Sequence, residues 1–329
     1  MREGINPAKY VSALAAYKQH RIIIPVYIPE QFGYFKYSLE ILDLCLRSLR
    51  CTTTGQYSIT LISNGCASEV VGQLSNYYKQ GWIDQLIINR ENHGKLDSIM
   101  TVARGAYEEL ITFADCDALF YPGWLDAVTQ IFNAFPEAGW VSSMPAPDTT
   151  WLNTTSTVFI AFSKGILKKR PVVAEENLNR FGESISRPEM YRSRTHECYL
   201  TVEREGVTGV VGGGHFSFSL RPQVFQKVPS VPSSRFISEE EFFGQPFDAA
   251  GYWRLSTPRL YVQHMGNIPE KWMYEDLERM GVENPDLQNR VLSPVIRPKT
   301  LLPYFMRRVF SKFIKKHHLM KFIPYGGNN

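Results

Sequence analysis

The sequence predicts an α/β fold built on a doubly wound, mostly parallel β-sheet, and two observations support this prediction. Short apolar runs rich in β-branched residues alternate with segments in which apolar residues recur three or four positions apart. The connections between the two kinds of segment are short, as they are in consecutive βα units. The chain has 329 residues, enough for one large domain with additions or for two domains.

The first half of the chain carries most of this alternation. A lead-in helix is expected at 5–20, and the strand expected at 21–29 contains three consecutive isoleucines before it meets prolines. Further strands, each a short apolar run closed by polar or turn residues, are expected at 57–62, 83–88, 110–114 and 139–144. Helices with one apolar face are expected at 39–52, 70–78, 96–107 and 124–135.

The second half is less regular. Residues 145–207 hold many Pro, Asn, Thr and charged residues, which is consistent either with an insertion that covers a binding site or with a solvated connection. Strands are expected again at 207–212, 216–220 and 259–264. We therefore expect one domain over 1–270, with 145–207 as an insertion, and a helical extension over 271–329.

Composition excludes some classes of protein. No run of roughly 18 apolar residues is present, so no transmembrane helix is expected, and Met1 is not followed by the apolar core of a secretory signal. The five cysteines are odd in number and lack metal-binding spacing, which favours reduced thiols and a cytoplasmic protein. The net charge of +4 is mild.

The segment 304–325 is a candidate basic amphipathic helix. Phe305, Met306, Val309, Phe310, Phe313 and Ile314 share one helical face, and Arg307, Arg308, Ser311, Lys312, Lys315 and Lys316 share the other. Such a helix can lie on an anionic membrane surface, here the inner face of the cell membrane. The alternative is a helix that packs its apolar face on the core and keeps its charges in water. No nucleic acid partner is expected, because the core lacks a basic patch interleaved with aromatic residues.

Three acidic or histidine features stand out as candidate site residues. Asp115 and Asp117 follow the expected strand at 110–114, where open α/β sheets bind ligands, and they suit Mg²⁺ or Mn²⁺. The alternative is a pair that caps the helix beginning at Trp124. Residues 239–241 are three glutamates, which can also be a solvated helix start. His264 ends the last expected strand and can equally be an ordinary hydrogen-bonded histidine.

The order of these features resembles that of family 2 glycosyltransferases with the GT-A fold. The features are the strand at 22–25, Ser63-Asn64-Gly65, Asn92-His93-Gly94-Lys95, Asp115-Cys116-Asp117, the glutamates before Ala250-Gly251-Tyr252, and His264. The resemblance covers about residues 20–266, so the tail lies outside it. It implies that 145–207 lies on the acceptor side of the site.

The resemblance also implies a role for each matching residue. The donor nucleotide and its phosphates would contact Pro25, Val26, Tyr27, Asn64, Asn92, Gly94, Lys95 and Asp115. Asn64 would act in place of the family's usual Asp, whose position Ser63 takes. Asp117 and His264 would bind the metal, Mn²⁺ or Mg²⁺. Glu240 would be the catalytic base, with Glu239 next to it as the second candidate.

The function implied is inverting, metal-dependent transfer from a nucleotide-diphospho-sugar, most simply a UDP-sugar. The acceptor would be a glycan or lipid-linked saccharide in cell-surface polysaccharide synthesis. A metal stabilises the diphosphate leaving group, and a carboxylate removes the acceptor proton. One alternative is a nucleotidyltransferase, but the loop at 27–33 lacks the basic residue expected of its phosphate loop. The other is a catalytically silent protein that binds sugar nucleotides.

Overall fold

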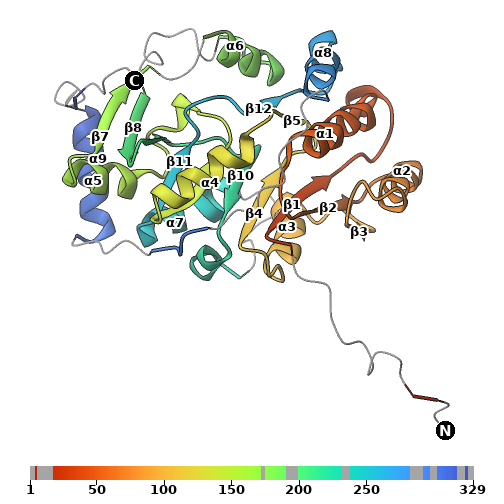
Figure 1. The fold of residues 1–329 in the computed structure, drawn as a ribbon, viewed down its shortest axis with the longest axis horizontal. Coiled ribbons are helices and arrows are strands. Elements are labelled where there is room, and N and C mark those ends of the chain that lie inside the picture. The colour runs from red at the N-terminus through yellow and green to blue at the C-terminus, as the bar shows by residue number, and fades with distance from the viewer. Residues whose placement is uncertain are drawn as a thin grey trace.

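The computed structural model describes residues 4–5, 18–171, 175–189, 199–230, 238–281, 292–296, 302–316 and 323–324. Within these ranges a mixed ten-stranded sheet runs through the molecule in the order β3-β2-β1-β4-β10-β6-β11-β9-β8-β7 (Figure 1). The predicted α/β class is confirmed. Most of the lead-in helix expected at 5–20 lies outside the described residues.

The part of the sheet formed by its first four strands is parallel, as the sequence predicts. Its four strands are β3 (Gln85–Asn89), β2 (Tyr57–Asn64), β1 (His20–Val26) and β4 (Leu110–Ala114). The remaining six strands are mostly antiparallel, because β10 is antiparallel to both β4 and β6 and, among these strands, only β6 and β11 pair in parallel. Its strands are β10 (Ser217–Leu220), β6 (Ala138–Ser142), β11 (Trp253–Ser256), β9 (Val207–Val211), β8 (Tyr199–Arg204) and β7 (Leu167–Arg170).

The segment expected at 145–207 as an insertion contributes to this sheet. It supplies β7 and β8, which extend the sheet beyond β9, and two helices. These helices are α5 (Thr155–Ser163) and α6 (Glu175–Ser184). Part of the irregular-looking sequence is therefore ordered sheet edge.

Helices cover both faces of the sheet. The remaining α-helices are α1 (Ser38–Thr52), α2 (Ser68–Lys79), α3 (Lys95–Ala103), α4 (Trp124–Ala134), α7 (Gln245–Ala250), α8 (Lys271–Met280) and α9 (Tyr304–Lys316). Shorter helical turns are Gly33–Phe35, Pro147–Thr149, Pro222–Lys227 and Glu240–Gly244. The helix expected at 96–107 ends at Ala103, before Gly105, and Tyr107 is exposed.

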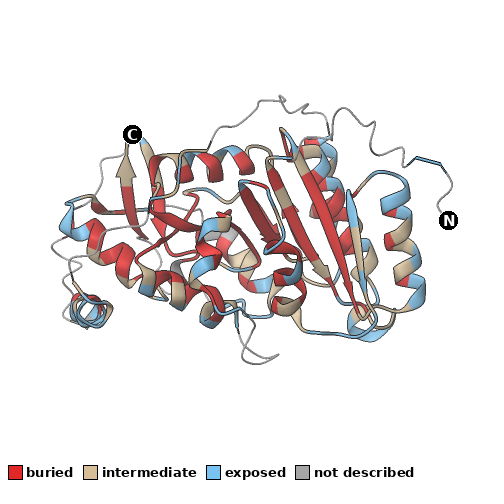
Figure 2. Ribbon diagram, turned by 90° about the horizontal axis from the view of Figure 1, so that it is seen from below, coloured by how far each residue is buried: buried red, intermediate tan, exposed pale blue. Residues whose placement is uncertain are grey.

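Alternation along the strands separates two apolar layers. Ile22 and Ile24 of β1 face the layer formed with α1, α2 and α4, whereas Ile23 faces the layer formed with α3 and α7. Figure 2 shows the strands buried between these helical layers. The carboxyl ends of β1, β2 and β4 consequently meet at one edge of the sheet.

A small second sheet lies beside that edge. Its two antiparallel strands are β5 (Ala118–Phe120), directly after Asp117, and β12 (Val262–His264). His264 pairs with Ala118, and the Met265 amide donates to the Asp117 carbonyl over 2.8 Å. This pairing brings the end of the last predicted strand to the acidic pair.

Helix α9 packs on α5 through a face that the sequence pattern does not single out. Its buried positions are Arg307, Ser311 and Ile314. The Arg307 guanidinium donates to the Ser156 hydroxyl and, over 3.1 Å, to the Ala249 carbonyl. The apolar side chains that point outward are instead Phe305, Met306, Val309 and Phe313, between 49% and 75% exposed. No described helix is long and apolar enough to cross a membrane.

Candidate active site

Asp115 and Asp117 follow β4 at the carboxyl edge of the parallel strands. The Asp115 amide donates to the Phe216 carbonyl over 2.8 Å, which fixes the backbone where the chain leaves the sheet. The turn then returns the chain into β5. Both carboxylates thus project from a backbone held on two sides, at the position where open α/β sheets bind ligands.

Asp117 and His264 lie side by side, although they are far apart in the sequence. Oδ2 of Asp117 is 3.3 Å from Nε2 of His264. Burial raises the pKa of Asp117; His264 opposes this rise, and the nearby Asp115 carboxylate adds to it. Oδ1 of Asp117 is buried and has no hydrogen-bond partner among the described residues. A buried carboxylate oxygen without a donor is an available cation ligand.

His264 is positioned from its other ring nitrogen. Nδ1 lies 3.0 Å from the Ser184 hydroxyl at the end of α6 and accepts a hydrogen bond from the Gly266 amide over 3.1 Å. The rings of Phe181 and Phe216 meet the imidazole edge to face. Nε2 therefore faces Asp117. Binding a cation through Nε2 requires the ring proton on Nδ1; in that tautomer Nδ1 donates to the Ser184 oxygen and no longer accepts from the Gly266 amide.

Lys95 joins Asp115 to Glu239. Its ammonium lies 2.5 Å from Oδ1 of Asp115 and 2.7 Å from Oε1 of Glu239. Burial would lower the pKa of Lys95, but the two carboxylates outweigh it and raise that pKa. Burial would raise the pKa of Glu239, but the nearby charges of Lys95 and His215 outweigh this effect and lower that pKa below its ordinary value. Three predicted site residues thus form one charged cluster.

Glu240 lies in a different environment from Glu239. The Arg254 guanidinium binds both of its carboxylate oxygens, at 2.5 Å and 2.6 Å, and the Asn153 amide donates to one of them over 3.0 Å. Arg254 also donates to the carbonyls of Leu152 and Gly213. Sequence reasoning missed Arg254, Asn153 and Ser184, because no local pattern marks a residue whose role depends on a contact across the fold.

Asn64 organises the loop before α3. Its amide nitrogen donates to Oδ1 of Asn92 over 2.9 Å, and its amide oxygen accepts from the His93 amide over 3.1 Å. Oδ1 of Asn92 also accepts from the Gly94 amide. Gly65 is required here, because its φ is +81° and a Cβ would lie 2.8 Å from the Asn92 nitrogen. Asn64 and Asn92 therefore shape the loop with their own side chains.

The predicted base-binding residues lie at the end of β1. Val26 is fully buried, Pro25 is half-buried, and Tyr27 is 44% exposed, with its ring edge-on to Phe35. Tyr27 is the member of this group with an accessible ring. It is therefore the one that can stack on a nucleotide base.

The donor set around Asp117 suits a hard divalent cation. No cluster of three or more His, Cys, Asp or Glu side chains with metal-binding geometry occurs in the described ranges. Mg²⁺ and Mn²⁺ do not need one, because they commonly combine one or two carboxylates with water and substrate phosphates. Asp117, with its unpartnered oxygen, and His264 fit that pattern.

Comparison with known proteins gives a family and a set of similar structures. The mannosyltransferase PcManGT from Pyrobaculum calidifontis, in complex with GDP-Man and Mn²⁺, is 14% identical; the match covers 79% of this chain and 60% of that one, with a TM-score of 0.43. S. aureus TarS 1–349 is 12% identical over 82% and 67% of the two chains, with a TM-score of 0.43. GalNAc-T7 with UDP, GalNAc and Mn²⁺ is 11% identical over 80% and 47%, with a TM-score of 0.44. The sequence matches no curated protein.

The family model described as glycosyl transferase family 2 matches residues 22–183. This range holds β1, β2 and β4 and, with them, Asn64, Lys95, Asp115 and Asp117, whereas the glutamates and His264 lie beyond it. The part of the chain that holds Asn64, Lys95, Asp115 and Asp117 is thus similar to glycosyl transferase family 2.

Proposed function

We propose that this chain is an inverting, metal-dependent glycosyltransferase that uses a nucleotide-diphospho-sugar, most simply a UDP-sugar. The observation that carries the proposal is the meeting of Asp117 and His264 beside the Lys95–Asp115–Glu239 cluster. The match of residues 22–183 to the model of glycosyl transferase family 2 supports the reaction type. The proposed acceptor is a glycan or lipid-linked saccharide, as in cell-surface polysaccharide synthesis.

In this proposal Asp117 and His264 hold Mn²⁺ or Mg²⁺. The cation, when bound, stabilises negative charge on the diphosphate leaving group. Tyr27 stacks on the base, and the loop shaped by Asn64 and Asn92 approaches the ribose and phosphates. Lys95 is held between Asp115 and Glu239, so its ammonium is fixed where it can meet a phosphate or sugar oxygen.

Removal of the acceptor proton is assigned to Glu240, with Glu239 as a positioning residue for Lys95. Both oxygens of Glu240 are bound by Arg254, so one of them must be released before it accepts a proton. Arg254 also donates to the carbonyls of Leu152 and Gly213. The guanidinium therefore stays anchored when the carboxylate turns away.

The test is titration of the full chain with UDP, with and without Mn²⁺, on the parent protein and on Asp117→Asn. The parent should bind UDP more tightly with Mn²⁺, and Asp117→Asn should lose that gain, because an amide is a weaker cation ligand than a carboxylate. Mn²⁺-independent binding in both proteins would refute the metal role. Release of pyrophosphate from a nucleoside triphosphate and a sugar phosphate would instead support a nucleotidyltransferase. UDP binding without turnover of any tested UDP-sugar would support a silent binding protein.

Attachment to a membrane surface is the second part of the proposal. The outward apolar side chains of α9 lie beside the exposed basic residues Arg308, Lys312 and Lys315. Apolar residues flanked by basic ones fit the headgroup region of an anionic membrane. A peripheral position at the inner face of the cell membrane would bring the site to a lipid-linked acceptor.

A further inference from the structure

A pocket separate from the acidic pair lies between α9, α7 and the loop before α5. Its volume is about 340 Å³, near the lower end of small-molecule sites, which span about 300–1,000 Å³. The wall comes from the loop before α5, from α7 and from one side of α9. Its lining includes Trp151, Asn153, Gln245, Arg308, Lys312 and Lys315.

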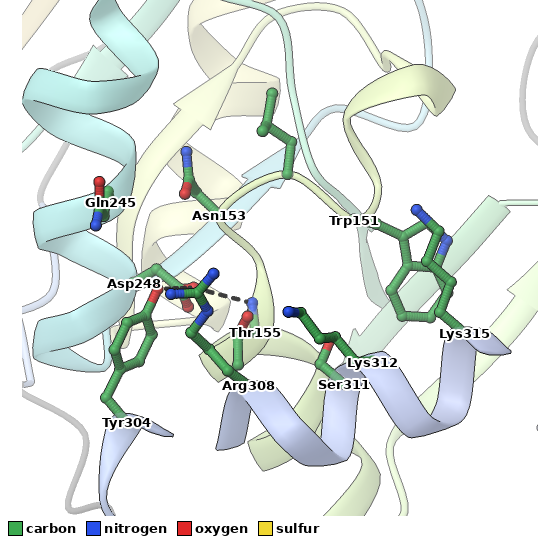
Figure 3. A pocket seen from close by; sticks show the side chains of 11 residues that line it. Trp151, Asn153, Thr155, Gln245, Asp248, Tyr304, Arg308, Ser311, Lys312 and Lys315 are labelled. Atoms are coloured by element: carbon green, nitrogen blue, oxygen red, sulfur yellow. Dashed lines mark hydrogen bonds between the residues drawn. The ribbon is translucent and has the colours of Figure 1, made fainter. Parts of the chain in front are cut away.

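The pocket is strongly basic. In Figure 3, Arg308, Lys312 and Lys315 extend from α9, and Asn153 and Gln245 lie across from them. Among the described residues, no carboxylate forms an ion pair with any of these three cations. All three side chains are exposed. Several cations around one polar cavity, without acidic partners, favour an anionic ligand.

One acidic side chain, Asp248, also lines the pocket, but hydrogen-bond donors within the fold already bind its carboxylate. Its carboxylate accepts hydrogen bonds from the Ser156 amide over 2.6 Å, the Thr155 amide over 3.2 Å and the Tyr304 hydroxyl over 3.1 Å. The two amides begin α5, where a helix favours negative charge. Asp248 is 1% exposed and therefore contributes little to the surface that a ligand meets.

Asn153 links this pocket to the proposed catalytic base. Its side chain lines the pocket and donates to Oε2 of Glu240. Its backbone adopts φ of +53°, a left-handed conformation that Asn tolerates better than most residues. Arg254, which holds Glu240, donates to the carbonyl of Leu152, another lining residue. A ligand in the pocket would therefore lie one side chain away from Glu240.

We propose that this pocket binds a phosphate group carried by the acceptor, a proposal that rests on the proposed transferase function. Arg308 and Lys312 donate charge-assisted hydrogen bonds to the phosphate oxygens, and Asn153 and Gln245 bind the adjoining polar part of the ligand. Trp151 also lines the pocket, and its indole can pack on a sugar ring. The phosphate belongs either to a soluble phosphorylated saccharide or to a lipid, and the two sources are separated by experiment.

The first experiment measures inorganic pyrophosphate binding to the full chain by calorimetry, with EDTA present so that no divalent cation serves Asp117. The double variant Arg308→Ala/Lys312→Ala should bind roughly tenfold more weakly or worse, because it loses two charge-assisted donors. Lys79→Ala/Lys271→Ala is the matched control, since it removes two exposed lysines elsewhere. Equal affinity in the parent and the pocket variant, or no binding by the parent, would overturn the proposal.

The second experiment distinguishes the two sources of phosphate. Glucose 1-phosphate represents the soluble source, and phosphatidylcholine vesicles with a minor fraction of phosphatidic acid represent the lipid source. Glucose 1-phosphate binding that is lost in the pocket variant supports the proposal and names the soluble source. Vesicle binding that is lost in the pocket variant supports the lipid source if vesicles given the same charge by oleic acid, which carries no phosphate, still bind the variant. Equal loss on both kinds of vesicle contradicts a phosphate site, because Arg308 and Lys312 also face the proposed membrane surface. Binding of neither contradicts it. UDP titration with Mn²⁺ on the same variant should match the parent, so failure at the acidic site is detected separately.

Discussion

The Arg254 guanidinium holds both carboxylate oxygens of Glu240, with Nη1 2.5 Å from Oε2 and Nη2 2.6 Å from Oε1. Arg254 itself is only 3% exposed. The carboxylate that is proposed to accept a proton is therefore bound on both oxygens by a buried cation. Substitutions of Glu239 and of Glu240 should therefore have different effects on activity.

Glu240→Gln should lower sugar transfer by about 100-fold or more while donor binding persists, because the amide cannot accept the acceptor proton. Glu239→Gln should instead weaken donor binding, since Lys95 loses one of its two carboxylates. Initial transfer rates and UDP titration on both variants make the comparison. Transfer that survives in Glu240→Gln but disappears in Glu239→Gln would move the base to Glu239.

Ser184→Ala should weaken Mn²⁺ binding by roughly tenfold to 100-fold, the usual cost of losing a partner that orients a metal-binding histidine. Ser163→Ala is a close control. Both hydroxyls donate to the carbonyl three residues earlier, but only that of Ser184 contacts His264. Mn²⁺ titration on the two variants is the measurement. Equal affinities would show that the histidine does not depend on this hydroxyl.

Gly65→Ala should destabilise the fold by roughly 1 kcal/mol or more, because it places a Cβ at positive φ and against the Asn92 backbone. It should also raise the donor KM through the displaced loop. Gly72→Ala, within α2 and with no atom within 4 Å of its added Cβ, should stabilise by about 0.5–1 kcal/mol. Thermal unfolding tests both values. A neutral Gly65→Ala would mean that the loop adapts.

Glu137 should contribute to stability at neutral pH and lose that contribution in acid. Burial alone would raise its pKa, but hydrogen bonds from Arg204 and Lys164 outweigh it and lower the pKa to about 2, from an ordinary value of 4.5. The contribution is complete above about pH 4.5 and fades as the pH falls towards 2. Glu137→Gln should cost roughly 2–3 kcal/mol at pH 7.

Chemical unfolding of the parent and of Glu137→Gln across this pH range checks the sign. The difference in unfolding free energy should shrink as the pH falls. Glu203→Gln is the comparator, because the Glu203 side chain is 23% exposed against 9% for Glu137. A difference that grows in acid would contradict the assigned direction.

Phe305→Ser/Phe313→Ser should reduce binding to anionic vesicles by roughly tenfold or more, since each outward phenylalanine would otherwise bury apolar area in the interface. Co-sedimentation is the measurement, and neutral vesicles show how much of the binding is electrostatic. Tyr78→Ser removes an aromatic ring of similar exposure from α2 and should leave vesicle binding unchanged. Equal binding by all three proteins would exclude α9 as the attachment site.

Regular features of the fold were predictable from sequence because their signals are local. The isoleucines of β1 and the spaced leucines of α1 are buried as their periodicity predicts. The edge strand β7 was not predictable, since it is the short basic segment Leu167–Arg170 without apolar alternation. It is held by its hydrogen bonds to β8 and by ion pairs of Lys168 and Arg170 with Glu203.

The candidate site was predictable only in part. Asp117 stood out by its place after a strand, but its pairing with His264 at a metal was expected only from the resemblance to family 2 glycosyltransferases. The β5–β12 pairing brings the two side chains together. The different partners of Glu239 and Glu240 could not be predicted from a run of three consecutive glutamates. Helix α9 shows the same limit, because its buried face includes Arg307, whose guanidinium finds partners only in the folded chain.

The attachment of α9 through Arg307 has a geometric consequence. The hydrogen bonds of the buried Arg307 guanidinium fix the orientation of α9 relative to the rest of the fold. A membrane that binds Phe305 and Phe313 would therefore hold the whole molecule in one orientation. The height of Asp117 above that plane would then be set by the fold. Such a protein would select acceptor hydroxyl groups by their distance from the lipid surface.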